Sequence, residues 1–515
     1  MASGREVIGT APRRAILVML NLVVKLMSDL AGVLSTIVSW FIAIARGGVR
    51  TTIGGCLLVA TLLLGGIGGA TDGAAQPSTA PPVADSIDLE QVVAQVLETY
   101  PSIDAARREV AAASARIGQA KSAYWPRVSA IASYRRQDPV PEVSVPGGPA
   151  GPGGGGGRSI GIQPNNLYDG HLQVRQTLYD FGRTASRIEQ AKAGRTAAER
   201  RVTVERTELA FQAVQAFYTT LLAEARIGVQ RDQIDQLKET LRVVQQQKAA
   251  GTATAFEVQS TRTRLSAARS QFTRFRSQLK RQEAELRRLL GSAPDATLSQ
   301  RLSGTVTPTL TPADTAQIDA DSLADQALLQ HPSVRVAQAQ VEAARRTVQV
   351  TDQSDAPSLA LTAQGGVKNG YPGDLNEPRL NESVGVSLTV PLFEGFATER
   401  QVEQAQAEVQ AAEARLTDVR RQVSTRVEQA GSDLRALLDR LASTQLRVEQ
   451  ARTAAELART RYEAGTITNL ELLEAETALQ QARLERTEVR YQVVLGRYAL
   501  QRAAGTLLPL DDSSL

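Results

Sequence analysis

The longest hydrophobic pattern in the chain is a seam of alanine, valine and leucine that begins at Val402. Its members recur at steps of three and four residues as far as Leu441. This spacing is that of a heptad seam with one slip, and it predicts a long helix that packs lengthwise against a neighbour. A second long helix is predicted for 183–249, which is 67 residues without a proline. At about 1.5 Å per residue, it would be roughly 100 Å long.

Both long helices are expected to end at a glycine, Gly251 in one case and Gly465 in the other. Glycine permits the left-handed conformation that stops a helix. From each stop a second helix is predicted to return, toward Gly291 and Gly505 respectively. The chain should therefore contain two long helical hairpins, with tips near 251 and 465.

Alternation of apolar and polar residues predicts a β-strand pair in front of each long helix. The pattern is cleanest where Val384, Val386 and Leu388 alternate with Gly385 and Ser387. The four predicted strands are 127–136, 171–179, 358–367 and 382–393. The segment between the first two strands, 137–170, is rich in glycine and proline and is predicted to be a loop.

The chain is an internal duplication. Two short segments each occur twice, 214 positions apart: 177–182 with 391–396, and 250–257 with 464–471. Before the first loop the offset is 231, from Pro126 to Pro357, so the first copy carries 17 extra residues there. These offsets define two repeats, 89–294 and 321–505, each reading helix, strand, loop, strand, long helix, turn, returning helix.

The start of the chain is interpreted as a leader. Arg46 and Arg50 precede an uncharged apolar run and then small residues, which predicts a secretory signal behind an N-terminal extension. The alternative is two retained inner-membrane helices. Cys56 lies in a sequence like a lipoprotein cleavage box, but the apolar run follows it, so we expect no lipidation. The ranges outside the repeats are 1–75 (extension and signal), 76–88 (linker), 295–320 (equatorial segment) and 506–515 (tail).

Composition and charge favour an extended helical protein and argue against nucleic-acid binding. Aromatic residues make up only 4% of the chain, which favours long helices packed side by side over a thick core. Of 58 Lys and Arg and 54 Asp and Glu, six bases and three acids precede Gln76. The body therefore has 52 bases against 51 acids, and no nucleic-acid partner is expected. The body has no cysteine, which suits an oxidising compartment.

The phrase Pro391-Leu392-Phe393-Glu394-Gly395 and the segment Tyr462–Ala475 resemble motifs of the TolC-like outer membrane factor (outer membrane efflux protein) family. The order, duplication and spacing of the elements match over about 89–505. The resemblance implies a mainly α fold with a small β part. In that fold, tandem α-hairpins of a homotrimer form an α-barrel tunnel, and four strands per chain build a 12-stranded β-barrel in the outer membrane. Two strand pairs from one chain leave open edges that lipid cannot satisfy, which also requires closure by other chains.

The resemblance further implies a passive exit duct of a tripartite efflux or type I secretion system, gated at its periplasmic tips. It would lie in outer-membrane lipid with a long periplasmic extension. Its partners would be a periplasmic adaptor and an inner-membrane pump driven by protons or by ATP. The alternatives are a membrane-anchored coiled-coil structural or tethering protein and a periplasmic adaptor. The paired strands argue against a tether, and two tandem hairpins argue against an adaptor.

A gate is expected where the resemblance places it. Glu471 and Glu474 lie three residues apart, on one helix face, and match acidic gate positions of the family. Tyr462 matches the gate tyrosine, and Glu257 the acid near it. Carboxylates crowded at a narrow entrance attract cations. This chain departs from the best-known member at two positions. Ile467 lies where that member has a gate arginine, and Arg459 lies where it has an acid, so the ionic links that close the gate would differ. The alternative for the two glutamates is a solvated helix face.

Two further groups of residues are expected to be functional. The adaptor is expected to contact the hairpin tips at Gly251, Thr252, Ala253, Gly465, Thr466 and Ile467. The strands are expected to pass into the tube at Leu178, Tyr179, Pro391, Leu392, Phe393 and Gly395.

No enzyme activity, cofactor or metal site is predicted. The only histidines, His171 and His331, lie far apart in the sequence. The glycine run 153–157 lacks the lysine and the preceding strand of a phosphate loop.

Overall fold

The computed structural model describes residues 87–145, 158–291, 302, 320–372 and 374–508. All of them belong to one compact unit that begins at Ala84. The predicted leader and most of the linker, the core of the Gly/Pro tract, most of the equatorial segment and most of the tail lie outside the described residues.

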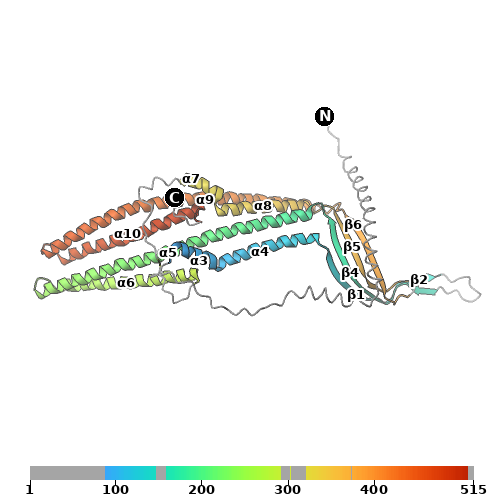
Figure 1. Cartoon of the computed structure of the whole chain (residues 1–515), viewed down its shortest axis with the longest axis horizontal. Coiled ribbons are helices and arrows are strands. Elements are labelled where there is room, and N and C mark those ends of the chain that lie inside the picture. Colours follow the sequence, from blue (N-terminus) through green and yellow to red (C-terminus); the bar gives the residue numbers. More distant parts are fainter. Residues whose placement is uncertain (1–86, 146–157, 292–301, 303–319, 373, 509–515) are drawn as a thin grey trace, which may run out of the picture. The chain divides into compact units, whose positions relative to one another are not determined.

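The two long helices dominate the fold (Figure 1). They are α5 (Arg183–Ala249) and α9 (Ala397–Glu463), each of 67 residues. Each turns into a 36-residue returning helix, α6 (Ala255–Leu290) and α10 (Asn469–Ala504). The shorter helices are α3 (Leu89–Thr99), α4 (Pro101–Lys121), α7 (Ala320–Gln330) and α8 (Pro332–Asp352). None of the described helices combines the length and apolarity that crossing a membrane requires.

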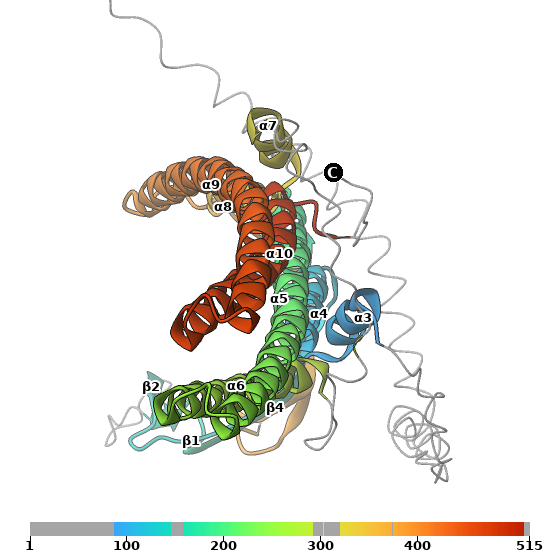
Figure 2. The same ribbon diagram turned by 90° about the vertical axis from the view of Figure 1, so that its left-hand side faces the viewer.

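The helices pack as a single layer that is four helices wide. Near the sheet the order of neighbours is α4, α5, α8, α9, and toward the tips it is α6, α5, α10, α9. Figure 2 views this layer end on. The predicted seam of α9 is the packed face, because Ala405, Ala412, Val423, Val427 and Leu434 are all buried. Small and branched side chains at these positions let helices lie lengthwise against one another.

The largest apolar cluster lies midway along α5. Phe217, 1% exposed, packs there with side chains from α3 and α6 and from the segment after α10. Its buried partners include Val92, Val96, Leu286, Leu289 and Leu507. A second cluster joins α9 to α10 through Leu434, Leu438, Val489 and Val493. Each repeat therefore has its own core.

Four antiparallel strands form one sheet in the order β1-β4-β5-β6. They are β1 (Arg127–Arg136), β4 (Asn166–Tyr179), β5 (Ser358–Lys368) and β6 (Arg379–Thr389). Within the described residues β1 and β6 have one unpaired edge each. Open edges of this kind are closed in a membrane by strands of other chains.

The predicted loop 137–170 was partly wrong. It contains a small hairpin of β2 (Glu142–Val145) and β3 (Arg158–Gly161), and β4 begins at Asn166 rather than at 171. The buried side chain of Asn369 accepts a hydrogen bond from the Tyr168 amide (2.7 Å) and donates one to the Asn166 carbonyl (2.7 Å). The start of β4 is thus tied to the residue that follows β5, while the ladder with β1 pairs residues 166–170 with residues 132–136. Likewise, β6 spans 379–389 rather than 382–393, since Pro391 cannot donate to a sheet.

Candidate functional site

Both hairpin tips, 250–254 and 464–468, are built in the same way. Gly251 has a φ of 77° and Gly465 a φ of 70°, the left-handed conformation that glycine adopts without strain. The Thr252 amide donates to the Gln247 carbonyl (2.9 Å), and its hydroxyl donates to the same oxygen (3.0 Å). Thr466 repeats both bonds. These bonds close a Schellman turn, which fixes each tip and satisfies carbonyls at the helix end.

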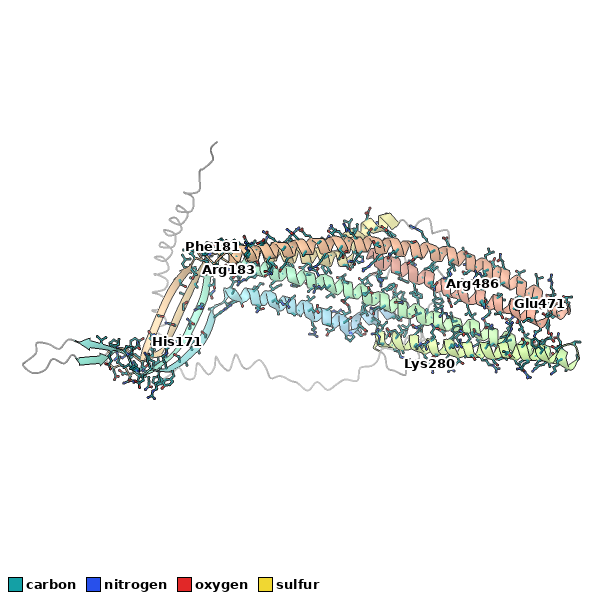
Figure 3. The ribbon with its side chains drawn as sticks, turned by 180° about the vertical axis from the view of Figure 1, so that it is seen from behind. His171, Phe181, Arg183, Lys280, Glu471 and Arg486 are labelled. Atoms are coloured by element: carbon teal, nitrogen blue, oxygen red, sulfur yellow. The ribbon has the colours of Figure 1, made fainter. Side chains whose placement is uncertain are left out.

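Two of the predicted gate acids cap the returning helices. The Glu257 carboxylate accepts hydrogen bonds from the amide (2.6 Å) and hydroxyl (3.0 Å) of Thr254. Glu471, at the tip in Figure 3, does the same with Thr468 at 2.8 and 3.2 Å. Each carboxylate completes a capping box and lies at the positive end of its helix. Glu474, further along α10, is exposed.

The two hairpins are joined to each other just above the tips. The buried Tyr462 hydroxyl donates to the Gln247 side-chain oxygen (2.7 Å). Asn469, 1% exposed, donates to the Thr261 hydroxyl (3.1 Å). Around them lies an apolar cluster of Val244, Val258, Tyr462 and Leu472, against which Ala253 and Ile467 pack. Burial, and then the nearby Glu257 charge, raise the pKa of Tyr462, so the phenol stays protonated and able to donate.

A buried carboxyl lies one level further from the tips. Glu476 in α10 is 7% exposed, and Arg459 approaches it to 3.4 Å. Beside it Arg264 donates to the Thr477 hydroxyl (2.9 Å), which links α6 to α10. Burial raises the pKa of Glu476 above the ordinary carboxyl value of 4.5, and Gln236 and Arg459 offset only part of that rise. The seam between the hairpins therefore holds a carboxyl group that binds its proton more tightly than an exposed carboxyl group does.

Replacing Glu476 with glutamine should stabilise the protein at neutral pH. The folded state binds the Glu476 proton more tightly than the unfolded state, so the free energy of unfolding falls as pH rises above 4.5. Glutamine keeps the hydrogen-bonding shape without the charge. Thermal unfolding midpoints should be higher for Glu476→Gln at about pH 7 and equal to wild type below about pH 4. The exposed Glu474→Gln is the control, and a lower midpoint for Glu476→Gln at neutral pH would contradict this account.

The two residues that differ from the family pattern, Ile467 and Arg459, both make defined contacts in the structure. Ile467 packs in the apolar cluster at the tip, and Arg459 contacts Glu476. Gln247, Thr261 and Asn469 were missed by sequence reasoning, because no spacing marks a polar residue that is buried by another hairpin. Phe256 and Leu470, 75% and 48% exposed, end the two segments 251–256 and 465–470 in which the sequence predicts contact with the adaptor.

The passage from strand to helix uses left-handed backbone conformations in both repeats. Phe181 and Gly182 have φ of 54° and 94°, and Gly395 and Phe396 have φ of 65° and 62°. A phenylalanine in the left-handed region is uncommon and has to be held there by its surroundings. The Phe181 ring packs edge-on against Tyr179, with 4.7 Å between ring centroids. Two residues later the guanidinium of Arg183 (Figure 3) ties the start of α5 to the end of α8, because it donates to the Gln353 carbonyl (3.0 Å) and to the Ala356 carbonyl.

The predicted junction residues lie at this passage. Leu178 and Tyr179 end β4, and the segment 391–395 forms the turn between β6 and α9. Leu392 is 93% exposed and Phe393 73% exposed, although both are apolar. Trp125, Tyr179 and Phe396 are also largely exposed near the same end of the sheet. An apolar and aromatic belt at the end of a strand is typical of a membrane interface.

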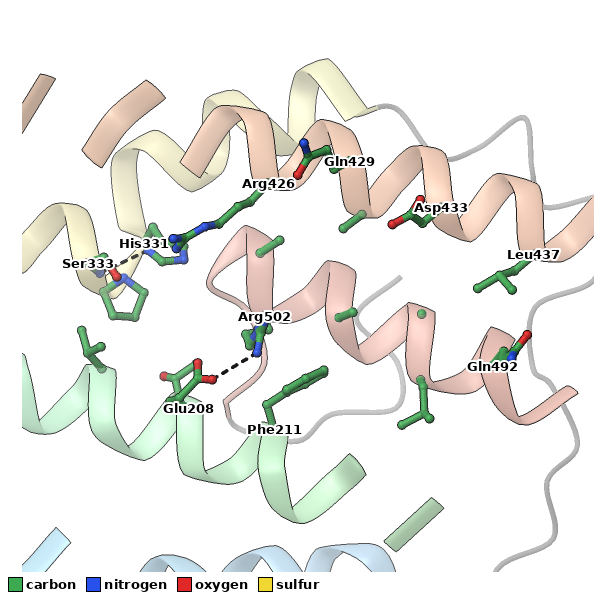
Figure 4. A pocket seen from close by; sticks show the side chains of 18 residues that line it. Glu208, Phe211, His331, Ser333, Arg426, Gln429, Asp433, Leu437, Gln492 and Arg502 are labelled. Atoms are coloured by element: carbon green, nitrogen blue, oxygen red, sulfur yellow. Dashed lines mark hydrogen bonds and ion pairs between the residues drawn. The ribbon is translucent and has the colours of Figure 1, made fainter. Parts of the chain in front are cut away.

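An open cavity of about 720 Å³ lies midway along the helices, between α5, α9, α10 and the start of α8 (Figure 4). Arg502 pairs there with Glu208 (3.2 Å) and covers the Phe211 ring. His331 accepts from the Ser333 amide (3.1 Å) and caps α8. Burial, with the nearby Arg426 and Arg502 charges, lowers the pKa of His331 and keeps it neutral. We assign it a structural role.

Comparison with known proteins decides the family. The family model described as outer membrane efflux protein matches residues 92–292 and 323–506, which is both repeats. The chain belongs to this family. The predicted fold class and outer-membrane location are confirmed. This outer membrane efflux protein is an exit channel for efflux or type I secretion, and it acts as a homotrimer with a periplasmic adaptor and an inner-membrane pump. Its family is one of transport proteins rather than enzymes.

Named relatives support the same assignment. The alkaline protease secretion protein AprF of Pseudomonas aeruginosa is 27% identical over 349 residues, covering 67% of this chain and 71% of AprF. Protein CyaE of Bordetella pertussis is 27% identical, covering 85% and 89%. Outer membrane protein TolC of Escherichia coli is 21% identical, covering 82% and 83%.

Solved structures share the fold. The outer membrane protein VceC of Vibrio cholerae superposes with a TM-score of 0.63 at 20% identity, covering 81% of this chain and 96% of VceC. The outer membrane channel CmeC of Campylobacter jejuni gives 0.63 at 18% identity, covering 81% and 85%.

Proposed function

We propose that this efflux protein is closed at its periplasmic end by the contacts between its two hairpins, and that an adaptor docks on the tips to open it. The observation that carries the proposal is the pair of hydrogen bonds from Tyr462 and Asn469 to the other hairpin. They lie close to the tips, where a small separation of the hairpins would break them. The tip residues Phe256 and Leu470 are exposed apolar side chains that suit a protein partner.

The predicted acidic gate is part of this proposal. Glu474 is exposed, and three copies of it in a trimer would gather carboxylates at the entrance. Glu471 and Glu257 would contribute mainly by fixing the tips, since both already accept hydrogen bonds from their own helix ends. Closure would then depend on neutral hydrogen bonds within the chain, with charge acting on the ions that pass.

The double variant Tyr462→Phe with Asn469→Ala should open the duct. Each hydrogen bond contributes about 1 kcal/mol, so losing both should favour separation of the hairpins roughly 30-fold in each protomer, and the three protomers of a channel should add to that shift. Current per inserted trimer in planar bilayers measures the change. Tyr134→Phe is the matched control, because it loses a tyrosine hydrogen bond to Asn166 in the sheet, far from the tips.

Two outcomes would overturn the hydrogen-bonded closure. One is a double variant that conducts like wild type while its trimer is intact. The other is a double replacement of Glu471 and Glu474 by glutamine that opens the channel as strongly, which would assign closure to the carboxylates instead.

A further inference from the structure

The barrel sheet has two chemically different faces, which its register defines. One row across the four strands joins Val128, Val174, Ala363 and Val384, and the row of Leu361 and Val386 lies on the same side. A barrel in a bilayer turns such an apolar face to lipid. The opposite face must therefore line the lumen, and its rows are polar, as in Ser129, Gln173, Gln364 and Ser383.

The lumen face is strongly basic, although the body of the chain is nearly neutral. Five of its six Asp, Glu, Lys and Arg residues are cations; the set is Arg127, Arg135, Asp169, Arg175, Lys368 and Arg379. Asp169 is the one acid, and its carboxylate lies 2.8 Å from the His171 ring nitrogen. The acid on β6, Glu382, lies in a row of the apolar face and does not offset these cations.

Two of the cations face each other directly. Arg127 and Arg175 are paired across β1 and β4 in the last row of that ladder on the side of the helices, and both are exposed. In the part of the chain that the structure describes, neither has an ion pair. Like charges directly opposite on a sheet destabilise it. Two neighbouring cations without an acid beside them leave a concentrated positive charge on the lumen face.

The trimer turns this pair into a ring. Three copies bring six arginines to one level of the barrel, just outside the passage from helices to strands. Rings of arginine and lysine select anions, and a low-dielectric wall focuses their field across the opening. Arg135, Lys368 and Arg379 add a second basic level at the far ends of the strands.

We propose that the β-barrel lumen is an anion-selective filter, with Arg127 and Arg175 as its selecting ring, and that the duct carries anionic cargo. The inference rests on the proposed function only in requiring that the chain conducts. Chloride is the probe of this chemistry, because it reports the sign of the field without any assumption about the size of the cargo.

The test is the reversal potential of wild type and of the double variant Arg127→Gln with Arg175→Gln, in planar bilayers across a KCl gradient. Wild type should prefer chloride over potassium, and the double variant should lose most of that preference, a several-fold fall in the permeability ratio. The variant should still assemble, because it removes a repulsive pair. A gel that resolves trimers checks this.

A matched control lies beside the lumen face. Arg135 and Arg136 are consecutive in β1 and lie on opposite faces, so Arg135→Gln should shift the potential while Arg136→Gln should not. All of these channels, including the reference with both arginines, carry Glu474→Gln, so that the acidic ring proposed at the entrance does not act on the potential. The proposal is overturned if the channel with both arginines prefers potassium, if the double arginine variant keeps the same potential, or if Arg136→Gln shifts it equally. The sign of the potential in this background does not depend on how often the tips open, so failure of this test and failure of the tip closure are separate results.

Discussion

Replacing Gly366 with valine should prevent the barrel from forming. Gly366 lies opposite His171 in the β4–β5 ladder. A Cβ atom added there would lie closer to the Gly170 carbonyl oxygen and the His171 Cα than van der Waals contact allows. Both obstacles belong to backbone, which cannot move aside without breaking the ladder. We expect almost no trimer in the outer-membrane fraction.

The neighbouring glycine is the control for this experiment. A Cβ added to Gly365 meets nothing within 4 Å, because it points to the other face of the sheet. Gly365→Val should therefore assemble as wild type does and adds an apolar side chain where lipid is expected. Equal trimer yields from the two variants would show that β4 and β5 leave room for a side chain at Gly366, contrary to the structure.

Replacing Phe217 with alanine should give the largest loss of stability of any single side chain. Phe217 is among the largest fully buried side chains and joins α5 to α3 and α6 in the central cluster. Removing a buried phenylalanine costs about 3–5 kcal/mol, through lost burial and the cavity that remains. The midpoint of thermal unfolding in detergent, followed by the helix signal in circular dichroism, should fall clearly.

Phe256→Ala is the control for Phe217→Ala. Phe256 is 75% exposed at a hairpin tip, so its removal should leave the midpoint nearly unchanged while weakening adaptor binding. A midpoint for Phe217→Ala within the scatter of wild type would mean that the central cluster collapses around the missing ring.

The order of the helices and strands along the chain could be predicted from the sequence, because each long element has a periodic hydrophobic pattern. The proline-free run predicted α5 over 183–249, its observed bounds. The alternation around Val384 and Val386 predicted β6, although not its ends. The small hairpin beside the Gly/Pro tract was missed because four-residue strands carry too little pattern. The early start of β4 was missed because residues 166–170 lie before the alternating segment, although they pair with β1.

The site was less predictable for a physical reason. Helix caps are local, so the Thr254–Glu257 and Thr468–Glu471 pairs can be found from a spacing of three residues. The sequence interpretation instead grouped Glu471 with Glu474 as an acidic gate face. The contact of Tyr462 with Gln247 joins residues 215 apart, at the ends of α9 and α5, and it forms because the α9–α10 hairpin packs on α5 through α10.

The repeat of one 67-residue helix and one 36-residue helix has a consequence for ancestry. A chain with a single repeat could build the same tube as a ring of six identical subunits, but every seam would then be alike. Covalent doubling allows the two halves to diverge. Positions equivalent to Tyr462, Asn469 and Glu476 hold lysine, alanine and arginine in the first repeat. The contacts within a chain and the contacts between chains can therefore diverge in sequence independently of each other.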